Sequence, residues 1–504
     1  MTQHTGAYNE ILYPSYLASQ CSPDQLAVMS RMKGLPAAPP NGCRMLELGC
    51  GNGASLLAYG YALPGSEFVG IDLAARPIEM GNEKIAAVGL NNVTLRCANV
   101  MDLDESYGDF DYIFAHGLFS WVPEPVRDRV LEICSERLTP HGVAYLSYNA
   151  YPGSFQRDML RAILQIHTRH LENPADKIRQ SLGIIEFIRS SPFRDTPYHE
   201  FFQGLHEHRT KAPSEVLLYD ELGDVNQPFF FHEFASLAAN HGLQFVNEAV
   251  FDETLSALPP PLRQALDSLG NDVVTFEQYL DFLTGRAFRQ TLLCHHGIAI
   301  DHRRRWEPLT GLFFAAPVLS QASRDSDPQD TRRFGGMHGR SAAVGDAGVQ
   351  RALEYLGSRW PSIVPFAELA EAGGGDAEML GRHLLQFAEG NFVKVHAGTF
   401  RLAPSISETP RASLLARSQL GERFLANLFC EAVSVTDPLG RLVLSRLDGS
   451  RDRAALRHEL DAVLAAQKPG NQAAQQQIEE VRRRLDEGLT KQLKDIFDLG
   501  LLEA

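Results

Sequence analysis

Several features are missing from this sequence of 504 residues, and each absence narrows the class of protein. The seven cysteines are scattered with no Cys-x-x-Cys pair, which argues against a zinc site or a disulfide framework and favours reduced thiols in a cytoplasm. No apolar run approaches the roughly 20 residues that a membrane-spanning helix needs, and residues 1–20 lack the pattern of a secretory signal. Lys and Arg (47) are fewer than Asp and Glu (62), so the net charge of −15 argues against general affinity for nucleic acid.

From residue 44 onward the sequence has an alternation of strand and helix patterns. The predicted strands are Met45–Leu48, Phe68–Ile71, Val93–Cys97, Phe110–Ala115 and Val143–Ser147. Helical patterns such as Arg76–Val88 lie between them. This alternation predicts an α/β fold with a parallel, doubly wound, Rossmann-like sheet. We therefore predict an N-terminal arm over residues 1–43 and a cofactor-binding domain over residues 44–255.

The cofactor-binding domain is predicted to contain an insertion, because residues 154–212 read as helices only. A helix at Phe231–His241 and a strand at Leu243–Val250 then resume the alternation and could complete the sheet. Phe288–Leu293, beyond this domain, is mainly apolar at helical spacing and is interpreted as core. The neighbouring Arg286 and Arg289 are interpreted as part of a solvated face.

Four further segments are predicted after the cofactor-binding domain, since the chain is too long for one ordinary core. Residues 256–322 are a helical connecting region, and residues 323–347, rich in Ser, Asp, Gly and Arg, are a linker. Three helices followed by a hairpin, Phe392–Val395 with Thr399–Leu402, predict a winged-helix-like domain over residues 348–404. It lacks a basic stripe, so we expect it to contact protein and not nucleic acid. Residues 405–504 are predicted to form a helical C-terminal domain.

A glycine-rich turn follows the first predicted strand and opens the first helix. Glu47 precedes the turn, and Gly49, Gly51 and Gly53 alternate within it, with Cys50 as a small filler. Alternating glycines allow a tight turn and let the backbone approach a ligand at a helix N-terminus. Dinucleotide sites place their third glycine one step later. The Gly-x-Gly-x-Gly spacing after an acid resembles instead the class I S-adenosylmethionine-dependent methyltransferases.

Two further positions agree with S-adenosylmethionine as the cofactor. Asp72, followed by Leu73, ends the second strand about 20 residues after the turn, where a carboxylate can accept hydrogen bonds from both ribose hydroxyls. Asn99 and Val100 follow the third strand, where these enzymes commonly carry an Asp that accepts from the adenine amino group. The amide oxygen of Asn99 can accept in the same way without charge assistance. For Asp72 alone, a helix cap is the alternative interpretation.

Aromatic and polar loops follow the fourth and fifth strands. In an open α/β sheet the reacting group meets the cofactor at the carboxyl ends of the strands. We expect the loops His116–Trp121 and Tyr148–Tyr151 to line the methyl-acceptor site, with Tyr148, Asn149 and Tyr151 closest to the nucleophile. His116 is a candidate cofactor contact and a candidate general base. Ordinary packing explains any one of these residues equally well. Methyl transfer needs no metal, and the sequence has no cluster of metal ligands.

The sequence resembles the bacterial methyltransferases that carry a methyltransferase regulatory domain, over most of its length. The motifs that carry the resemblance are Tyr8-Asn9-Glu10, Tyr13-Pro14-Ser15, Leu46–Gly53, Trp121-Val122-Pro123, Tyr148–Gly153, Val225-Asn226-Gln227-Pro228, His232-Glu233-Phe234, Phe276–Phe282, Phe288–Leu293 and Leu447-Asp448-Gly449. The sequence departs from the family after its glycine turn, where Ala54-Ser55-Leu56 replaces Gly-Asn-Leu. This group includes rickettsial protein lysine methyltransferases, so the resemblance implies a protein lysine side chain as one methyl acceptor.

Three functions remain open at this point. The first is N-methylation of a protein, with the C-terminal domains as a platform for the substrate or for a homodimer. The second is methylation of a small molecule or natural product. The third is a cofactor-binding regulatory scaffold without turnover. The sequence does not give the acceptor, because a fold does not fix a function.

Overall fold

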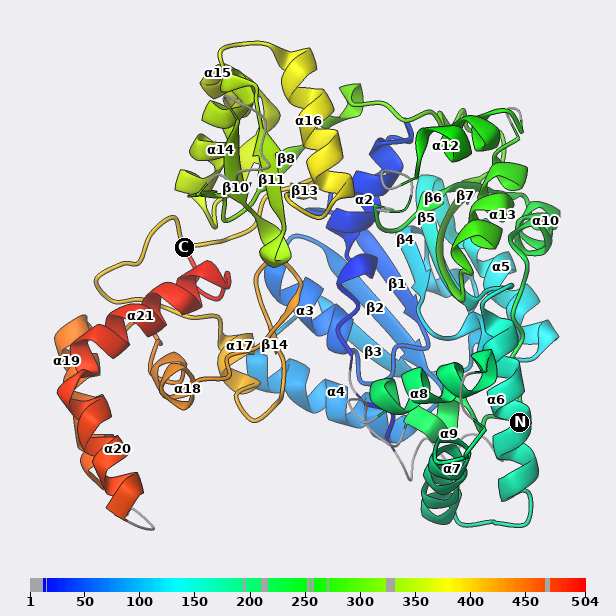
Figure 1. Ribbon diagram of the computed structural model, residues 1–504, viewed down its shortest axis with the longest axis horizontal. Helices are drawn as coiled ribbons and strands as arrows, with labels where there is room; N and C mark the ends of the chain where they lie inside the picture. Colours follow the sequence, from blue (N-terminus) through cyan, green and yellow to red (C-terminus); the bar gives the residue numbers. More distant parts are fainter. Residues whose placement is uncertain are drawn as a thin grey trace.

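The computed structural model describes residues 12–14, 16–193, 196–209, 216–251, 254, 258–269, 272–322, 331–466 and 472–504. The Tyr8-Asn9-Glu10 motif, Ser15, residues 323–330 of the predicted linker and Gly470 lie outside these described residues. Figure 1 shows a central sheet with helices on both faces, and further domains on one side of it.

The central sheet has seven strands in the order β3-β2-β1-β4-β5-β7-β6. They are β1 (Arg44–Leu48), β2 (Glu67–Asp72), β3 (Val93–Cys97), β4 (Phe110–Ala115), β5 (Leu138–Asn149), β6 (Leu243–Glu248) and β7 (Phe288–His295). The first five strands are parallel, whereas β7 runs antiparallel to both β5 and β6. The Rossmann-like fold class is therefore as predicted, with two additional strands at one edge. The strand order reverses between β1 and β4, which is where open α/β sheets bind ligands.

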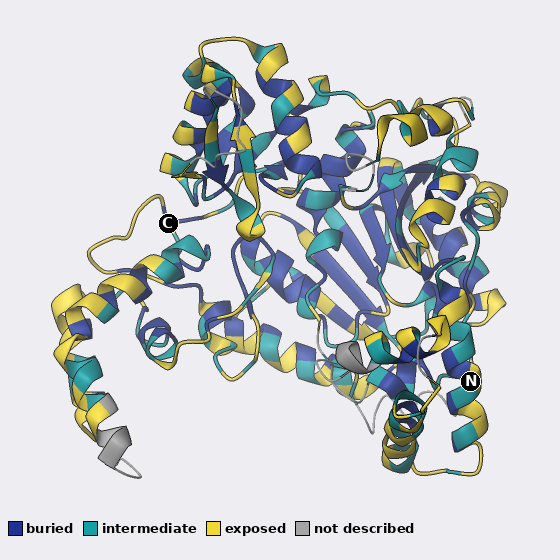
Figure 2. Cartoon of the chain, in the orientation of Figure 1, coloured by how far each residue is buried: buried dark blue, intermediate teal, exposed yellow. Residues whose placement is uncertain are grey.

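Successive side chains of a strand point to opposite faces of the sheet and so contribute to two hydrophobic cores, one on each face. One core holds Met45, Tyr112 and Tyr145 under α2 (Pro23–Arg31), α3 (Ala54–Ala62) and α4 (Ala75–Val88). The other holds Leu46, Ile113 and Tyr148 under α5 (Glu124–Arg137) and α10 (Phe231–Asn240). Figure 2 shows the resulting pattern, with buried strands between helices that expose their outer surfaces.

A helical insertion lies between β5 and α10, at the carboxyl ends of the strands. It contains α6 (Ser154–Thr168), α7 (Pro174–Arg189), α8 (Pro197–Arg209) and α9 (Val216–Asp220). A small core of its own, including Leu160, Leu164 and Ile185, holds these helices together. α12 (Pro260–Asp267) and α13 (Val273–Thr284) precede β7, and α13 packs beside α10.

The prediction that residues 256–322 are a helical region is wrong in part, because Phe288–His295 forms β7 in the interior of the sheet. Short apolar runs do not distinguish a buried strand from a buried helix by their periodicity, and Leu292 and Leu293 are both fully buried because both faces of β7 are covered. The interpretation of Arg289 as a solvated residue is also wrong, since its side chain is 0% exposed. Arg286 is mostly buried too, at 17%.

Residues 312–403 form a second unit around two small sheets. One sheet contains β8 (Phe313–Ala315), β12 (Val364–Pro365) and β13 (Lys394–His396), and the other contains β9 (Leu319–Gln321), β10 (Arg332–Gly335) and β11 (Ser341–Val344). The unit's helices are α14 (Ala347–Arg359), α15 (Phe366–Gly373) and α16 (Ala377–Glu389).

Two predictions for this second unit are wrong. The described part of the predicted linker contains β10 and β11, whose few apolar residues, such as the fully buried Phe334, are too sparse to give a visible hydrophobic period. The predicted hairpin does not form, because β13 pairs with the distant β8, and Leu402 instead bridges to Glu503. Pairing between strands far apart in sequence leaves no local signal.

The C-terminal unit has its own core, which includes Val443, Leu460 and Leu489. Its elements are α17 (Leu414–Ser418), β14 (Leu425–Ala426), β15 (Ala432–Val433), α18 (Pro438–Leu444), α19 (Arg453–Ala466), α20 (Gln472–Arg483) and α21 (Leu485–Asp498). In the part of the chain that the structure describes, no helix combines the length and apolarity needed to cross a lipid bilayer.

The N-terminal helix α2 links the second unit to the sheet domain. Asp24 in α2 is buried, and its carboxylate accepts hydrogen bonds from the backbone N–H groups of Ala397 and Gly398 at 2.8 and 3.1 Å. The same carboxylate contacts Nδ1 of the buried His396 at 2.7 Å. Docking of the second unit therefore depends on a residue near the start of the described chain.

Candidate cofactor and acceptor site

The glycine turn lies at the carboxyl end of β1 and is shaped by left-handed backbone conformations. Gly49, Gly51 and Gly53 have φ values of 77°, 55° and 68°, which residues with a Cβ rarely adopt. The N–H groups of Gly49 and Cys50 both donate to the carbonyl oxygen of Ile71, at 2.9 and 3.0 Å. The turn is thereby fixed against the end of β2, and it leads directly into the N-terminus of α3.

Asp72 is the carboxylate that holds this turn. Its Oδ2 accepts from the N–H of Gly51 and its Oδ1 accepts from the N–H of Ala74, both at 2.8 Å. Burial raises the pKa of Asp72, and these backbone hydrogen bonds partly offset that effect. Each carboxylate oxygen has a second lone pair, so Asp72 can still accept from a pair of ligand hydroxyls. The predicted ribose contact is therefore compatible with the structural role.

Glu47 faces the same region from β1 and is only 7% exposed. Burial, and then the negative charge of Asp72, raise the pKa of Glu47 well above its usual range. Among the described residues its Oε2 has no hydrogen-bond partner, although buried polar atoms usually have one. An ammonium group would supply that partner, so the donor set fits the amino-acid end of S-adenosylmethionine.

The predicted adenine side of the pocket lies at the ends of β2 and β3. Leu73 is 47% exposed beside Asp72, and Val100 is half-buried. The Oδ1 atom of Asn99 accepts from the N–H of Met101 at 3.1 Å and caps a short helical turn. That oxygen keeps one lone pair, so Asn99 stays a predicted adenine contact. The 37% exposed Met101 beside it was not singled out by sequence.

His116, at the end of β4, is held from three sides. Its Nδ1 lies 2.8 Å from the hydroxyl oxygen of Tyr145. Its ring stacks on that of Tyr16, with the centroids 5.7 Å apart, and the ring of Phe288 packs edge-on against it with a centroid distance of 6.0 Å. Burial lowers the pKa of His116 to about 4, so the imidazole is neutral at neutral pH. A histidine base that titrates near its ordinary pKa of about 6.5 therefore does not fit this environment.

The N-terminal arm brings Tyr16 to this position. The N–H of Ala18 donates to the Ser55 hydroxyl in α3 at 3.1 Å, and the Tyr13 hydroxyl donates to Asp220 in α9 at 3.4 Å. The arm thus crosses from the helical insertion to the glycine turn. Tyr16 was missed by sequence reasoning, although it follows the Tyr13-Pro14 motif by only two residues.

The end of β5 and the loop that follows it separate the predicted acceptor residues, since Tyr148 and Asn149 lie in β5 and Tyr151 lies after it. Tyr148 is 1% exposed, and its ring stacks on Phe234 at 4.0 Å in the core beneath α10. His116 contacts Tyr145, which belongs to the core on the opposite face of the sheet. Our prediction that Tyr148 lies next to the nucleophile does not fit this placement, because its ring is buried in the core beneath α10.

Asn149 and Tyr151 instead belong to one polar chain. The amide nitrogen of Asn149 donates to Asn226 at 2.6 Å, Asn226 donates to Asp158 at 3.1 Å, and the Tyr151 hydroxyl donates to Asp158 at 2.7 Å. Asn226 lies in the Val225-Asn226-Gln227-Pro228 motif, which carried a family resemblance but no assigned role. The chain ties the loop after β5 to the insertion, and Asn149 and Tyr151 stay predicted acceptor-site residues.

Comparison with known proteins identifies three parts of the chain. Family models match residues 45–142 as a methyltransferase domain, residues 213–295 as a predicted methyltransferase regulatory domain, and residues 408–501 as the C-terminal winged helix domain of PKMT. The last match places a winged helix in the segment that we predicted only as helical. The glycine turn, the strand order and these matches define a class I S-adenosylmethionine-dependent methyltransferase.

Two uncharacterized proteins of Rickettsia prowazekii are similar in sequence. RP789 is 36% identical over 296 residues, which are 58% of this chain and 53% of RP789, so the alignment spans about half of that relative. RP028 is 34% identical over 233 residues, which are 46% of this chain and 93% of RP028. The chain belongs to this family of bacterial methyltransferases with a methyltransferase regulatory domain.

The solved structure of PKMT2 from Rickettsia typhi has the same fold. The TM-score is 0.85 with 24% sequence identity, over 97% of this chain and 99% of PKMT2. A second structure of PKMT2, in complex with AdoHcy, gives a TM-score of 0.84. The likeness extends over all units of the chain and at this identity concerns the fold.

Proposed function

We propose that this protein transfers a methyl group from S-adenosylmethionine to the side-chain amine of a lysine in a protein. The observation that carries the proposal is the match of residues 408–501 to the C-terminal winged helix domain of PKMT, a group of protein lysine methyltransferases. The full-length likeness to PKMT2 supports it, because methyltransferase domain, regulatory domain and C-terminal unit occur together in one arrangement.

The site residues fit a transfer that depends mainly on positioning. S-Adenosylmethionine supplies a methyl group on a sulfonium, which is a good leaving group. We propose that Glu47 binds the amino-acid end of this cofactor, that Asp72 binds its ribose, and that Leu73, Asn99 and Val100 line the adenine. The Gly49–Gly53 turn lets the backbone come close, and Cys50 fills the turn without reacting, since burial raises its thiol pKa well above the usual range.

The acceptor side offers a neutral imidazole and aromatic walls. We propose that His116, fixed by Tyr145 and Tyr16, borders the lysine Nζ, with Asn149 and Tyr151 at the outer end of the site. The lysine must lose a proton before its lone pair attacks the methyl carbon as the C–S bond breaks. Because the unperturbed pKa of lysine is near 10.4, turnover should rise with pH through the neutral range.

The proposal is tested with methyl-labelled S-adenosylmethionine and bacterial lysate proteins, followed by gel electrophoresis and mass spectrometry of the labelled bands. We expect label on methyl-lysine, and no label when the lysines have first been blocked by acetylation. Asp72→Ala serves as the control without cofactor binding. Label that persists on lysine-blocked proteins, or that appears only in small molecules, would overturn the assignment.

A further inference from the structure

Five aromatic side chains form a continuous, partly exposed surface beside the proposed acceptor site. This aromatic face consists of Tyr151, Phe155, Phe230, Tyr279 and Phe282. Tyr151 stacks on Phe155 with ring centroids 4.2 Å apart, and Phe230 contacts Tyr151, Phe155 and Phe282 at 5.2, 6.3 and 6.2 Å. Tyr279 packs edge-on against Phe282 at 5.7 Å.

The face is open to solvent, although its residues are large and apolar. Phe155 is 55% exposed, Phe282 is 49% exposed and Tyr279 is 46% exposed. The three rings come from α6 and α13, which are joined through Phe230 at the start of α10. Figure 1 shows α10 and α13 side by side at one edge of the molecule. Contiguous exposed apolar surface of this kind marks an interaction site more often than a structural need.

The aromatic face is continuous with the proposed acceptor site. The loop between α13 and β7 packs on the loop after β5, because Gly153 donates to the carbonyl of Arg286 and Ala150 donates to that of Ala287. The next residue, Phe288, touches His116. A chain segment that placed one side chain beside His116 would therefore run along this loop onto Phe282 and Phe155.

The charges around the aromatic face favour a cationic partner. Neither α10 nor α13 contains a lysine or an arginine. The carboxylates of Asp158 and Glu233 lie at its border, where they accept from the Tyr151 hydroxyl and the Phe230 N–H. The nearby Arg157 is directed to Trp121 and Asp220. Aromatic ring faces attract guanidinium and ammonium groups, and adjacent carboxylates add to that attraction.

We propose that the aromatic face binds arginine or lysine side chains that flank the methylated lysine in the substrate protein. This inference rests on the proposed function, because it places the flanking segment next to the acceptor site. It assigns to Phe155, Tyr279 and Phe282 a role in choosing the substrate, separate from cofactor binding and from the transfer itself.

The test uses two synthetic peptides with one central lysine, flanked either by arginines or by serines. Binding is measured by fluorescence anisotropy and methylation by label transfer, for wild type, Phe155→Ala, Phe282→Ala and the double variant. Phe187→Ala is the matched control, since Phe187 on α7 is 71% exposed and, among the described residues, has no ring contact with the aromatic face. Affinity for S-adenosylhomocysteine reports whether each variant keeps its cofactor pocket.

Wild type should bind the arginine peptide more tightly than the serine peptide. Each substitution in the aromatic face should weaken arginine-peptide binding about two- to fivefold, and the double variant should lose most of the preference. Phe187→Ala and the affinity for S-adenosylhomocysteine should be unchanged.

Equal binding of the two peptides by wild type would overturn the proposal. So would an equal loss in Phe187→Ala, or a change in oligomeric state in Phe282→Ala measured by sedimentation, which would assign the face to a second copy of the chain. If the arginine peptide binds as expected but its lysine is not methylated, the proposed function fails while the aromatic face stands.

Discussion

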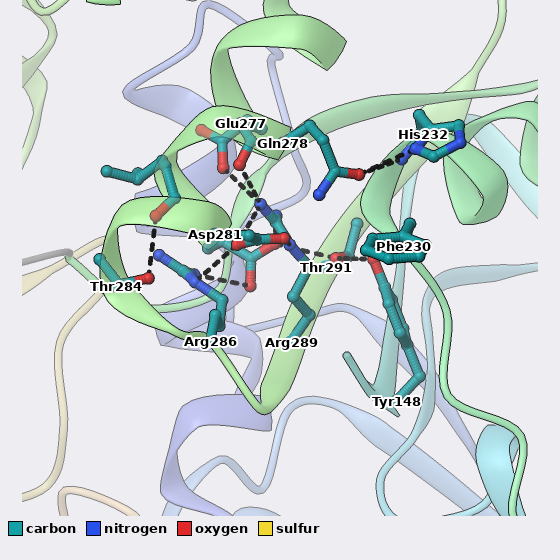
Figure 3. A network of polar contacts seen from close by, with 12 residues as sticks. Tyr148, Phe230, His232, Glu277, Gln278, Asp281, Thr284, Arg286, Arg289 and Thr291 are labelled. Carbon is teal, nitrogen blue, oxygen red and sulfur yellow. Dashed lines mark hydrogen bonds and ion pairs between the residues drawn. The ribbon is translucent and has the colours of Figure 1, made fainter. Parts of the chain in front are cut away.

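Two groups of buried carboxylates in this protein have opposite surroundings. Burial raises the pKa of both Glu47 and Asp72 at the glycine turn, the charge of Asp72 raises that of Glu47 further, and Glu47 is left with an unpartnered oxygen among the described residues. Glu248, Glu277 and Asp281, near β7, surround Arg289, whose guanidinium contacts them at 2.7 to 2.9 Å. Figure 3 shows Glu277 and Asp281 of this second group beside Arg289.

The Arg289 cluster is complete within the chain. The guanidinium lies 3.9 Å from the ring centroid of Phe231, and Glu248 also accepts from the Thr291 hydroxyl at 2.9 Å. Burial opposes the charge, but the carboxylates raise the pKa of Arg289 above its usual value. The difference between the two groups shows how burial and charge distinguish a binding site from an internal support. One group lacks a cation that a ligand can bring, and the other already has it.

Removing the carboxylate of Asp72, the proposed ribose contact, should have the largest effect. We expect Asp72→Ala to weaken S-adenosylmethionine binding by about 3–6 kcal/mol, because two charge-assisted hydrogen bonds are lost at about 1.5–3 kcal/mol each. Calorimetry measures this, with the exposed Asp102→Ala as control. An affinity of Asp72→Ala within about twofold of wild type, a difference well under 1 kcal/mol, would contradict the assignment of Asp72 to a binding site.

Removing the internal cation should damage stability and not binding. We expect Arg289→Met to lower the free energy of unfolding by about 3–5 kcal/mol, because three buried carboxylates lose the guanidinium that contacts them and only Glu248 and Asp281 keep an ion pair with Arg286. Denaturant unfolding measures the loss, and Arg286→Met, which removes a more exposed cation, should cost less. Unchanged stability with reduced cofactor affinity would reverse the roles assigned to the two groups.

The unpaired carboxylate predicts a pH dependence of binding. Because the folded-state pKa of Glu47 is raised, its contribution to stability is present at low pH and is lost as pH rises through that pKa. A bound ammonium favours the ionised form, so cofactor affinity should increase with pH over the same range, at most about tenfold per pH unit. Glu47→Gln should flatten both curves, as measured by thermal unfolding and calorimetry from acid to neutral pH. Parallel pH profiles for wild type and Glu47→Gln would remove Glu47 from the pocket.

The smallest effect should come from substitution of Tyr148, which was predicted to lie in the acceptor site and is instead buried in the core. Tyr148→Phe removes a hydroxyl whose contact with Thr291 is 3.3 Å long, so we expect about 1 kcal/mol of stability or less to be lost and turnover to be kept. Asn149→Ala should lower kcat more, because it breaks the polar chain to Asn226. Steady-state kinetics, with a substrate that the protein is known to methylate, compares the kcat values of the two variants. A loss of turnover in Tyr148→Phe greater than that in Asn149→Ala would return Tyr148 to the acceptor site.

The sequence predicted those parts of the site that local chain segments build. β1 to β4, the glycine turn and the end of β2 at Asp72 each depend on a few consecutive residues. The sequence did not predict β7, the burial of Arg289 or the contact of Tyr148 with Phe234, because these depend on pairing with distant segments. A buried arginine and an exposed one look alike in sequence when their partners, such as Glu248, lie far along the chain.

The position of β7 between β5 and β6 has a consequence for biosynthesis. A ribosome releases β5 long before β7, so β5 has a free edge until residue 295 has emerged, and unpaired strand edges favour aggregation. The N-terminal helix waits longer still, since Asp24 meets its N–H donors only at Ala397 and Gly398. The interior of the sheet and the docking of the second unit are therefore completed only after most of the chain has been synthesised.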